Sequence, residues 1–184
     1  VIFTHSHKDH TAGLDDVRAY NFLQGMDMPV YAHEKVLDQL KSEYAYAFEP
    51  HSYPGIPRLK LLAITEVPFQ IGSTTIIPLP VVHLNMPVYG YRVGDFSYIT
   101  DANAIPAATL QKLKGTRVLV LNALQKEKHV SHFNLEEAVA MSRSIGAERT
   151  YLTHLSHKMG LHKSVQTELP AGVELAYDGL SVTL

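Results

Sequence analysis

One short stretch near the start of the chain most constrains the fold, because it places several metal-binding side chains where a strand gives way to a helix. Residues 5–10 read His-Ser-His-Lys-Asp-His, after the apolar run Val1–Phe3, which is typical of a buried strand. Side chains alternate in extended backbone, so His5 and His7 are expected to point the same way. Asp9 and His10 come as the chain turns into a helix and can aim at the same spot from another direction. Two directions of approach are what two adjacent metal ions require.

The ligand types in this stretch favour a catalytic metal over other uses. Neutral imidazole and carboxylate together suit Zn, Mn, Fe or Ni better than Ca. A lone histidine is usually an ordinary core or surface residue, but three histidines and an aspartate within six residues are harder to explain that way. A metal-sequestering histidine tract is the alternative, and such tracts are usually repetitive.

Composition narrows the function classes. The 184 residues fit one domain, and a hydrophobic content of 46% supports a sizeable core. A net charge of −2 provides no broad basic surface for a large nucleic acid. No apolar run approaches the roughly 20 residues of a membrane span. The chain has no cysteine, which leaves no disulfide or thiolate metal site. This is compatible with a reducing cytoplasm, where we expect the protein.

The periodicity of the chain predicts a mixture of helices and strands, and hence an α/β or α+β fold. The expected helices span residues 11–24, 34–48, 106–114 and 134–145, and a loop spans 49–57. The expected strands span residues 29–32, 59–65, 67–71, 74–82, 89–93, 96–100, 117–122, 149–153, 173–177 and 180–184.

Polar side chains recur where an apolar strand ends. Examples are His5, His83, Asp101 and His154. Functional sites of layered α/β folds collect at strand ends, so these residues are candidates for one site.

The motif of residues 5–10 resembles the metal-binding motif of the metallo-β-lactamase fold. The continuation Gly13–Arg18, which reads Gly-Leu-Asp-Asp-Val-Arg, resembles a narrower branch. That branch is the phosphoribosyl 1,2-cyclic phosphate phosphodiesterases of the carbon–phosphorus lyase pathway. The resemblance covers nearly the whole chain and implies a single domain over residues 1–184 with a four-layer αββα sandwich. It also implies several strands before residue 1, so we expect the domain to be N-terminally incomplete.

The resemblance implies two divalent metal ions, zinc or manganese, and a ligand for each position. One ion would be held by His5, His7 and His83, and the other by Asp9, His10 and His154. Asp101, which follows the run Tyr98–Thr100, would bridge both ions. Two ions about 3.5–4 Å apart can share a hydroxide whose pKa lies near neutrality.

The resemblance also implies roles beyond the metal shell. His132 matches a family histidine near the substrate phosphate, where it would stabilise charge or protonate the leaving alkoxide. Asp9 and His132 are therefore the expected catalytic residues, and an ordinary residue at the approach to a helix is the alternative for His132. Arg18 would bind a second phosphate, or else form an exposed ion pair on a helix. His157 is expected outside the catalytic site, either as a partner of upstream cysteines around a structural zinc or as a plain surface residue.

The leading functional hypothesis is a metal-dependent phosphodiesterase that opens a small cyclic phosphate such as phosphoribosyl 1,2-cyclic phosphate. A tRNA 3′-processing or cyclic-nucleotide phosphodiesterase of the same fold, a thioester hydrolase and a non-catalytic metal-binding domain are the alternatives. The expected partner is a small phosphorylated substrate, with no membrane and no large nucleic acid. A homodimer is left open beside a monomer.

Overall fold

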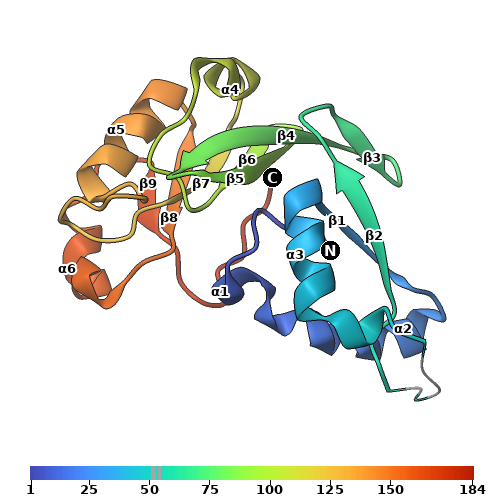
Figure 1. The fold of residues 1–184 in the computed structure, drawn as a ribbon. Helices are drawn as coiled ribbons and strands as arrows, with labels where there is room; N and C mark the ends of the chain where they lie inside the picture. Colours follow the sequence, from blue (N-terminus) through green and yellow to red (C-terminus); the bar gives the residue numbers. More distant parts are fainter. Residues whose placement is uncertain (51–52, 54) are drawn as a thin grey trace. The chain divides into compact units, whose positions relative to one another are not determined.

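The computed structural model describes residues 1–50, 53 and 55–184 (Figure 1). The chain forms two compact units, Val1–Thr65 and Glu66–Leu184. The loop expected over residues 49–57 includes residues 51, 52 and 54, which lie outside the described part. No helix within the described part is both long and apolar enough to span a membrane.

The first unit packs helices against a parallel pair of strands. Its elements in order are α1 (Lys8–Thr11), the 3-10 helix η1 (Ala12–Val17), α2 (Arg18–Gln24), β1 (Met28–His33), α3 (Glu34–Glu43), the 3-10 helix η2 (Ala45–Ala47) and β2 (Leu59–Ile64). Strands β1 and β2 run parallel, with Val30 opposite Leu61. Val36, Leu37 and Leu40 lie on one face of α3 and join Val30 in the core of this unit.

Two helices of the first unit differ from the sequence prediction. The helix expected over residues 11–24 begins at Lys8 and is interrupted by η1, which contains Gly13 and two aspartates, all weak helix formers. Its buried face includes Asn21, whereas Tyr20 is exposed. The helix expected over residues 34–48 ends at Glu43. Tyr44 leaves the helical conformation, and its buried hydroxyl donates a hydrogen bond to the Thr11 carbonyl (2.8 Å).

The expected strand Val1–Phe3 is reduced to one bridge between Ile2 and Tyr31. Hydrogen bonds still hold this segment to β1, because Phe3 donates to the Tyr31 carbonyl and Tyr31 donates to the Val1 carbonyl. Phe3 is buried, but Val1 is 43% exposed and no strand forms, so the prediction of a buried strand over Val1–Phe3 is wrong.

The second unit is built on a seven-stranded mixed sheet. Its elements in order are β3 (Phe69–Ile71), β4 (Thr74–His83), β5 (Met86–Val93), β6 (Phe96–Ile99), α4 (Ala107–Lys112), β7 (Val118–Asn122), α5 (Leu135–Ile145), β8 (Arg149–Thr153), the 3-10 helix η3 (His157–Met159), α6 (His162–Gln166) and β9 (Val173–Leu175). The strand order follows the sequence, with antiparallel pairing from β3 to β6 and parallel pairing from β6 to β9. The predicted mixed α/β class is therefore confirmed.

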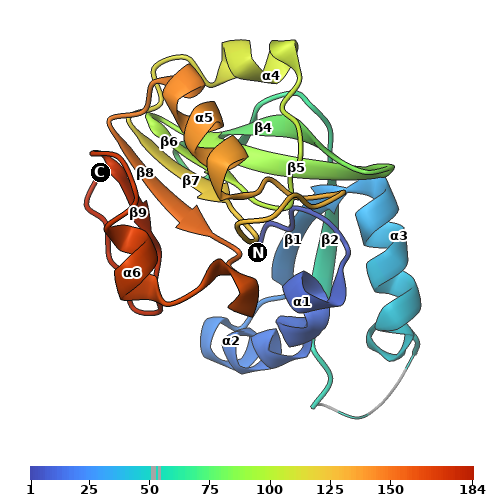
Figure 2. The ribbon, with the colours of Figure 1, turned by 90° about the vertical axis from the view of Figure 1, so that its left-hand side faces the viewer.

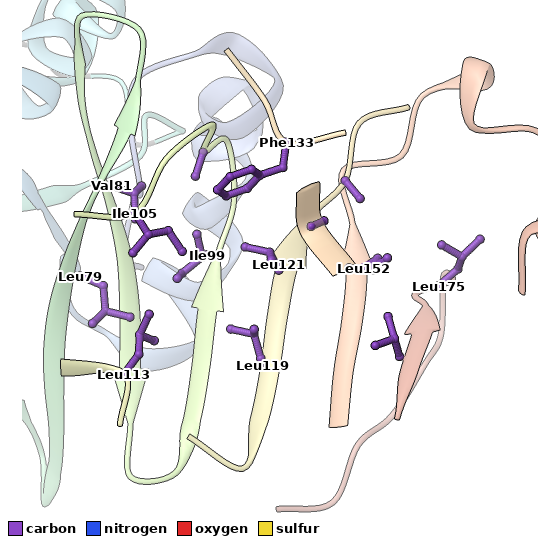
Figure 3. Close-up of a cluster of buried hydrophobic side chains, with 14 of the residues drawn as sticks. Leu79, Val81, Ile99, Ile105, Leu113, Leu119, Leu121, Phe133, Leu152 and Leu175 are labelled. Atoms are coloured by element: carbon purple, nitrogen blue, oxygen red, sulfur yellow. The ribbon is translucent and has the colours of Figure 1, made fainter. Parts of the chain in front are cut away.

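Helices α4, α5 and α6 cover one face of this sheet (Figure 2). Alternate residues of the strands point toward them, so Leu119 and Leu121 of β7 meet Leu152 of β8 in one apolar cluster (Figure 3). Helix α5 starts with a capping box, in which Asn134 and Glu137 each bond the other's backbone N–H. Its start is therefore fixed directly after the segment that carries His132.

Strand β4 extends beyond its short neighbour β3. Helix α4 covers the part of the β4 edge that does not pair with β3. Pro78 and Pro80 lie on this stretch, where the missing N–H has no neighbouring strand to bond. Their carbonyls accept hydrogen bonds from the side chains of Lys112 (3.3 Å) and Thr109 (2.6 Å), respectively. The edge of β4 is thus closed by side chains of the helix that follows Asp101.

Gly90 of β5 packs against the end of β6. A Cβ at this position would lie 2.7 Å from the Tyr98 carbonyl oxygen and 2.8 Å from Cγ1 of Ile99. Both distances are shorter than a van der Waals contact, so the sheet is built around a glycine here.

The predicted final strand over residues 180–184 is wrong. The chain turns after β9, with Leu180 donating a hydrogen bond to the Tyr177 carbonyl. Leu180, Val182 and Leu184 then line a cavity with Phe96 and Tyr98 of β6, instead of pairing in the sheet. The apolar residues of this segment alternate because every second side chain packs on the sheet, and not because the segment pairs as a strand.

Candidate metal centre

The first unit gathers the four side chains of the His-x-His-x-Asp-His motif around the start of α1. The ring centroids of His5 and His7 are 4.7 Å apart, and those of His5 and His10 are 4.3 Å apart. Nε2 of His10 lies 3.3 Å from a carboxylate oxygen of Asp9. The alternation expected for His5 and His7 is therefore present, and the turn into α1 brings the other two side chains to the same place.

The most buried of these side chains is held by its neighbour in the chain. His5 is fully buried, and its Nδ1 lies 3.0 Å from Oγ1 of Thr4. A hydrogen bond to one ring nitrogen fixes the ring orientation and directs the other nitrogen toward a metal. Thr4 thereby acts as an orienting group for His5.

In the second unit, Asp101 and His154 follow the ends of strands in an unusual backbone conformation. Asp101 comes after β6 with φ of 54°, and His154 comes after β8 with φ of 57°. A left-handed conformation costs a non-glycine residue about 1–2 kcal/mol, so the surrounding contacts must hold it in place. The sequence predicted both positions but gave no sign of this conformation.

Asn122, at the end of β7, supplies that restraint for Asp101. Its side chain is fully buried and forms two hydrogen bonds with Ala102, accepting from the backbone N–H and donating to the carbonyl, both at 2.9 Å. The Ala102 carbonyl also accepts from the Phe133 N–H (2.7 Å). Both the N–H and the carbonyl of Ala102, the residue after Asp101, are thus held by hydrogen bonds.

The Asp101 carboxylate is the centre of a cluster with His132 and His154. Its Oδ1 lies 3.0 Å from Nε2 of His132 and 3.3 Å from Nε2 of His154, and its Oδ2 accepts a hydrogen bond from Thr100 (2.6 Å). The two imidazole rings stack, with centroids 5.0 Å apart and planes 12° apart. Ligand atoms of all three residues lie within 4.8 Å of one another.

This donor set fits a divalent transition metal. Two imidazoles and one carboxylate are the ligand types that zinc and manganese accept, and the buried carboxylate has the pairing that a buried charge requires. His132 therefore lies among residues that could hold a metal.

His83, the last residue of β4, belongs to the same unit. It is buried, and its ring meets that of His132 edge-on with centroids 4.8 Å apart. Its Nδ1 lies 2.9 Å from the Ser131 carbonyl oxygen. A carbonyl can only accept, so Nδ1 carries the proton and Nε2 is the nitrogen available as a ligand.

Two further predicted residues lie on the surface. Arg18 forms an exposed ion pair with Asp15, with a nitrogen–oxygen distance of 3.5 Å. His157 is exposed at the start of η3, and none of the candidate metal groups in the described part of the chain includes it. Its place outside the catalytic ligands is consistent with the prediction.

Sequence reasoning missed two residues that organise the second unit, Asn122 and Ser131. Asn122 had the same signal as Asp101 and His154, a polar side chain closing an apolar strand, and could have been found by it. Ser131 precedes His132 in a segment without periodicity, and nothing in the sequence alone singles it out.

Comparison with known proteins places the chain in a family. Residues 1–155 match the family model of the beta-lactamase superfamily domain. The chain belongs to the beta-lactamase superfamily. Its fold is that of the metallo-β-lactamase-fold hydrolases, as the His-x-His-x-Asp-His motif predicted, and proteins of this fold family typically bind divalent metal ions.

Solved structures of this superfamily resemble the whole chain. A diphosphatase of the PhnP family has 34% sequence identity and a TM-score of 0.91, with 100% of this chain and 70% of that chain covered. YhfI of Bacillus subtilis, a metallo-β-lactamase-fold protein, has 22% identity and a TM-score of 0.75, with 98% and 75% covered. The PhnP branch is therefore the part of the superfamily that this chain resembles.

A curated relative carries a different activity. An octanoyltransferase of Porphyromonas gingivalis is 36% identical over 186 residues, which cover 100% of this chain and 37% of that protein. The chain thus spans little more than a third of the length of this curated relative.

Proposed function

We propose that the chain is a metal-dependent phosphodiesterase whose centre holds two divalent ions, zinc or manganese. In this proposal His5, His7 and His83 hold one ion, Asp9, His10 and His154 hold the other, and Asp101 bridges them. The ligand types support it, and so does the clustering of the motif side chains within each unit. When bound, such ions activate a water molecule and neutralise charge on a phosphate.

The observation that carries the proposal is the position of His132 beside Asp101. Asp101 as a carboxylate can only accept, so Nε2 of His132 carries the proton of their 3.0 Å contact. A proton held on Nε2 next to the bridging carboxylate can be delivered to a leaving alkoxide. Asp9, which is exposed, would hold its ion and accept a hydrogen bond from the attacking water.

The proposed substrate is a small cyclic phosphate such as phosphoribosyl 1,2-cyclic phosphate. The Gly13–Arg18 segment supports this choice through its resemblance to the phosphodiesterase branch. Arg18 is exposed and could exchange Asp15 for a second phosphate of the substrate, forming a bidentate pair. A diphosphate is the second candidate substrate, because the PhnP-family relative with 34% identity is a diphosphatase.

Octanoyl transfer receives less support. The matched region is 37% of the octanoyltransferase, which leaves almost two thirds of that protein to carry the acyl transfer. An octanoyl thioester therefore belongs in the substrate panel as the test of this alternative.

The proposal is tested by metal content and a substrate panel on protein purified without chelator. Elemental analysis should find close to two equivalents of metal. With added Mn²⁺ or Zn²⁺, bis(p-nitrophenyl) phosphate and a ribose cyclic phosphate should be hydrolysed faster than a diphosphate, an octanoyl thioester or a β-lactam. Preferred turnover of the thioester or the β-lactam would reject the phosphodiesterase assignment.

The role of His132 has its own test. His132→Ala should lower turnover of the cyclic phosphate by roughly 10²-fold or more with metal content unchanged, as loss of a general acid does. Loss of metal in this variant would make His132 a ligand instead. His157→Ala is the matched control, since it removes an exposed imidazole of the same unit that belongs to none of the candidate metal groups in the described part of the chain.

A further inference from the structure

Ser131 occupies a buried position between two histidines in the segment that links β7 to α5. Its side chain is 5% exposed. The segment around it is fixed by backbone hydrogen bonds, with Phe133 bonded to both Ala102 and Leu124. Asn103 also donates to the Val130 carbonyl (3.0 Å). Ser131 therefore has a defined orientation although it lies outside any helix or strand.

The backbone of Ser131 holds one proposed ligand. Its carbonyl accepts the hydrogen bond from Nδ1 of His83 at 2.9 Å. This contact sets the ring orientation of His83 and leaves Nε2 as the nitrogen that can bind an ion. Any side chain at position 131 would keep this contact, because it uses only the main chain.

The side chain of Ser131 holds the proposed acid. Its Oγ lies 2.9 Å from Nδ1 of His132, whose opposite nitrogen faces Asp101. Nδ1 of His129 lies 3.1 Å from the same nitrogen of His132 and 3.3 Å from the hydroxyl. The ring of His132 is therefore held at one nitrogen by the Ser131 hydroxyl, which donates to Nδ1, and at the other by the carboxylate.

We propose that Ser131 is a positioning residue that aligns His83 and His132 with each other, through its carbonyl and its hydroxyl respectively. This inference rests on the proposed function, because it assigns His132 the delivery of a proton to the leaving group. The hydroxyl keeps Nε2 of His132 directed at the point where the leaving oxygen departs. Small errors in such alignment are costly, since a displacement of about 1 Å can lower a rate by 10²-fold.

The test uses Ser131→Ala in the full-length protein, because this change removes the hydroxyl and keeps the carbonyl that holds His83. Two phosphodiesters are compared, one with an alkoxide leaving group, such as a 2′,3′-cyclic nucleotide, and one with p-nitrophenolate. The nitrophenolate leaves without needing a proton, so a misaligned acid should matter less for it. We expect kcat on the alkoxide substrate to fall at least about 10-fold more than kcat on bis(p-nitrophenyl) phosphate, with KM changed less than kcat.

Two further measurements make the result decisive. Ser131→Thr restores a hydroxyl and should recover most of the lost kcat, whereas a role in packing alone would not depend on the hydroxyl. Elemental analysis of Ser131→Ala should give the metal content of the wild type. Equal losses on both substrates, or loss of metal, would overturn the assignment of Ser131 to His132.

His132→Ala in the same assays separates this inference from the proposed function. If His132→Ala shows no dependence on the leaving group, the acid role fails and the Ser131 inference fails with it. If His132→Ala shows the dependence and Ser131→Ala does not, the Ser131 inference alone is wrong.

Discussion

Oδ1 of Asp101 lies 3.3 Å from Nε2 of His154, and both residues have a left-handed backbone just beyond a strand. Strands β6 and β8 are separated by β7, whose last residue, Asn122, bonds the backbone after Asp101. The sheet thus holds the two side chains at a fixed spacing, and the turns direct them toward each other. The predictions below test how far metal binding and stability depend on this arrangement.

Replacing Asp101 should affect both proposed ions at once. Asp101→Ala removes the carboxylate that the proposal places between the ions, so metal content should fall from two equivalents toward zero in elemental analysis. Asp95→Ala is the matched control, because Asp95 is an exposed carboxylate paired with Arg117 in the same unit. Two tightly bound ions in Asp101→Ala would show that the carboxylate does not bridge.

Replacing Asn122 should weaken the support of Asp101. Asn122→Ala leaves the buried Ala102 N–H without its acceptor, which should lower the free energy of unfolding by roughly 1–3 kcal/mol in urea denaturation. Metal affinity should fall as well, because the Asp101 turn loses its restraint. Asn122→Asp keeps an acceptor for the N–H but sets a second acceptor against the Ala102 carbonyl in a fully buried site, so it should not restore the lost stability. A stable Asn122→Ala with wild-type metal affinity would contradict the role given to this side chain.

The capping box at α5 should contribute measurably to stability. Asn134→Ala removes the side-chain acceptor of the Glu137 N–H (2.8 Å) and should cost about 1 kcal/mol. Asn134→Asp preserves the acceptor and serves as the control in the same denaturation experiment. Equal stability of the two variants would mean that water replaces the cap.

Acid should destabilise the first unit partly through Glu43. A hydrogen bond from Gln39 and the ammonium of Lys8, 2.8 Å away, hold the pKa of the Glu43 carboxyl below its ordinary value of 4.5. A lowered pKa in the folded state contributes stability above the ordinary value, and this contribution is lost as pH falls through the folded-state pKa. Below pH 4.5 the free energy of unfolding should therefore decline more steeply for wild type than for Glu43→Gln. Parallel curves in acid denaturation would contradict this account.

The sequence predicted those elements whose residues repeat with a clear period or end in a polar side chain. Strand β7 is an apolar run that ends at Asn122, and β8 has Tyr151 and Leu152 shortly before His154. The polar residues Asn122 and His154 at these strand ends lie in the candidate site. The alternating pattern of Leu180–Leu184 predicted a strand wrongly, because these side chains pack over β6 and the segment does not pair in the sheet. Helix α6 was missed because five residues are too few to establish a period.

The sequence predicts a site residue when its side-chain type indicates a function. It does not predict a residue whose role depends on a contact that forms only in the folded structure. Histidine and aspartate residues at strand ends indicate a candidate metal site. By contrast, Ser131 works through a carbonyl and a hydroxyl, groups that every chain contains in abundance. Only the folded structure shows that this serine meets both His83 and His132.

Gly90 touches none of the proposed ligands, yet the position of Asp101 depends on it. A methyl group there would collide with Tyr98 and Ile99, and the end of β6 would shift together with the aspartate that follows it. A genetic screen for inactive variants would accordingly recover changes at this glycine alongside changes at the ligands themselves. Such a variant would resemble a ligand mutant in every assay except one, because excess metal should partly rescue it.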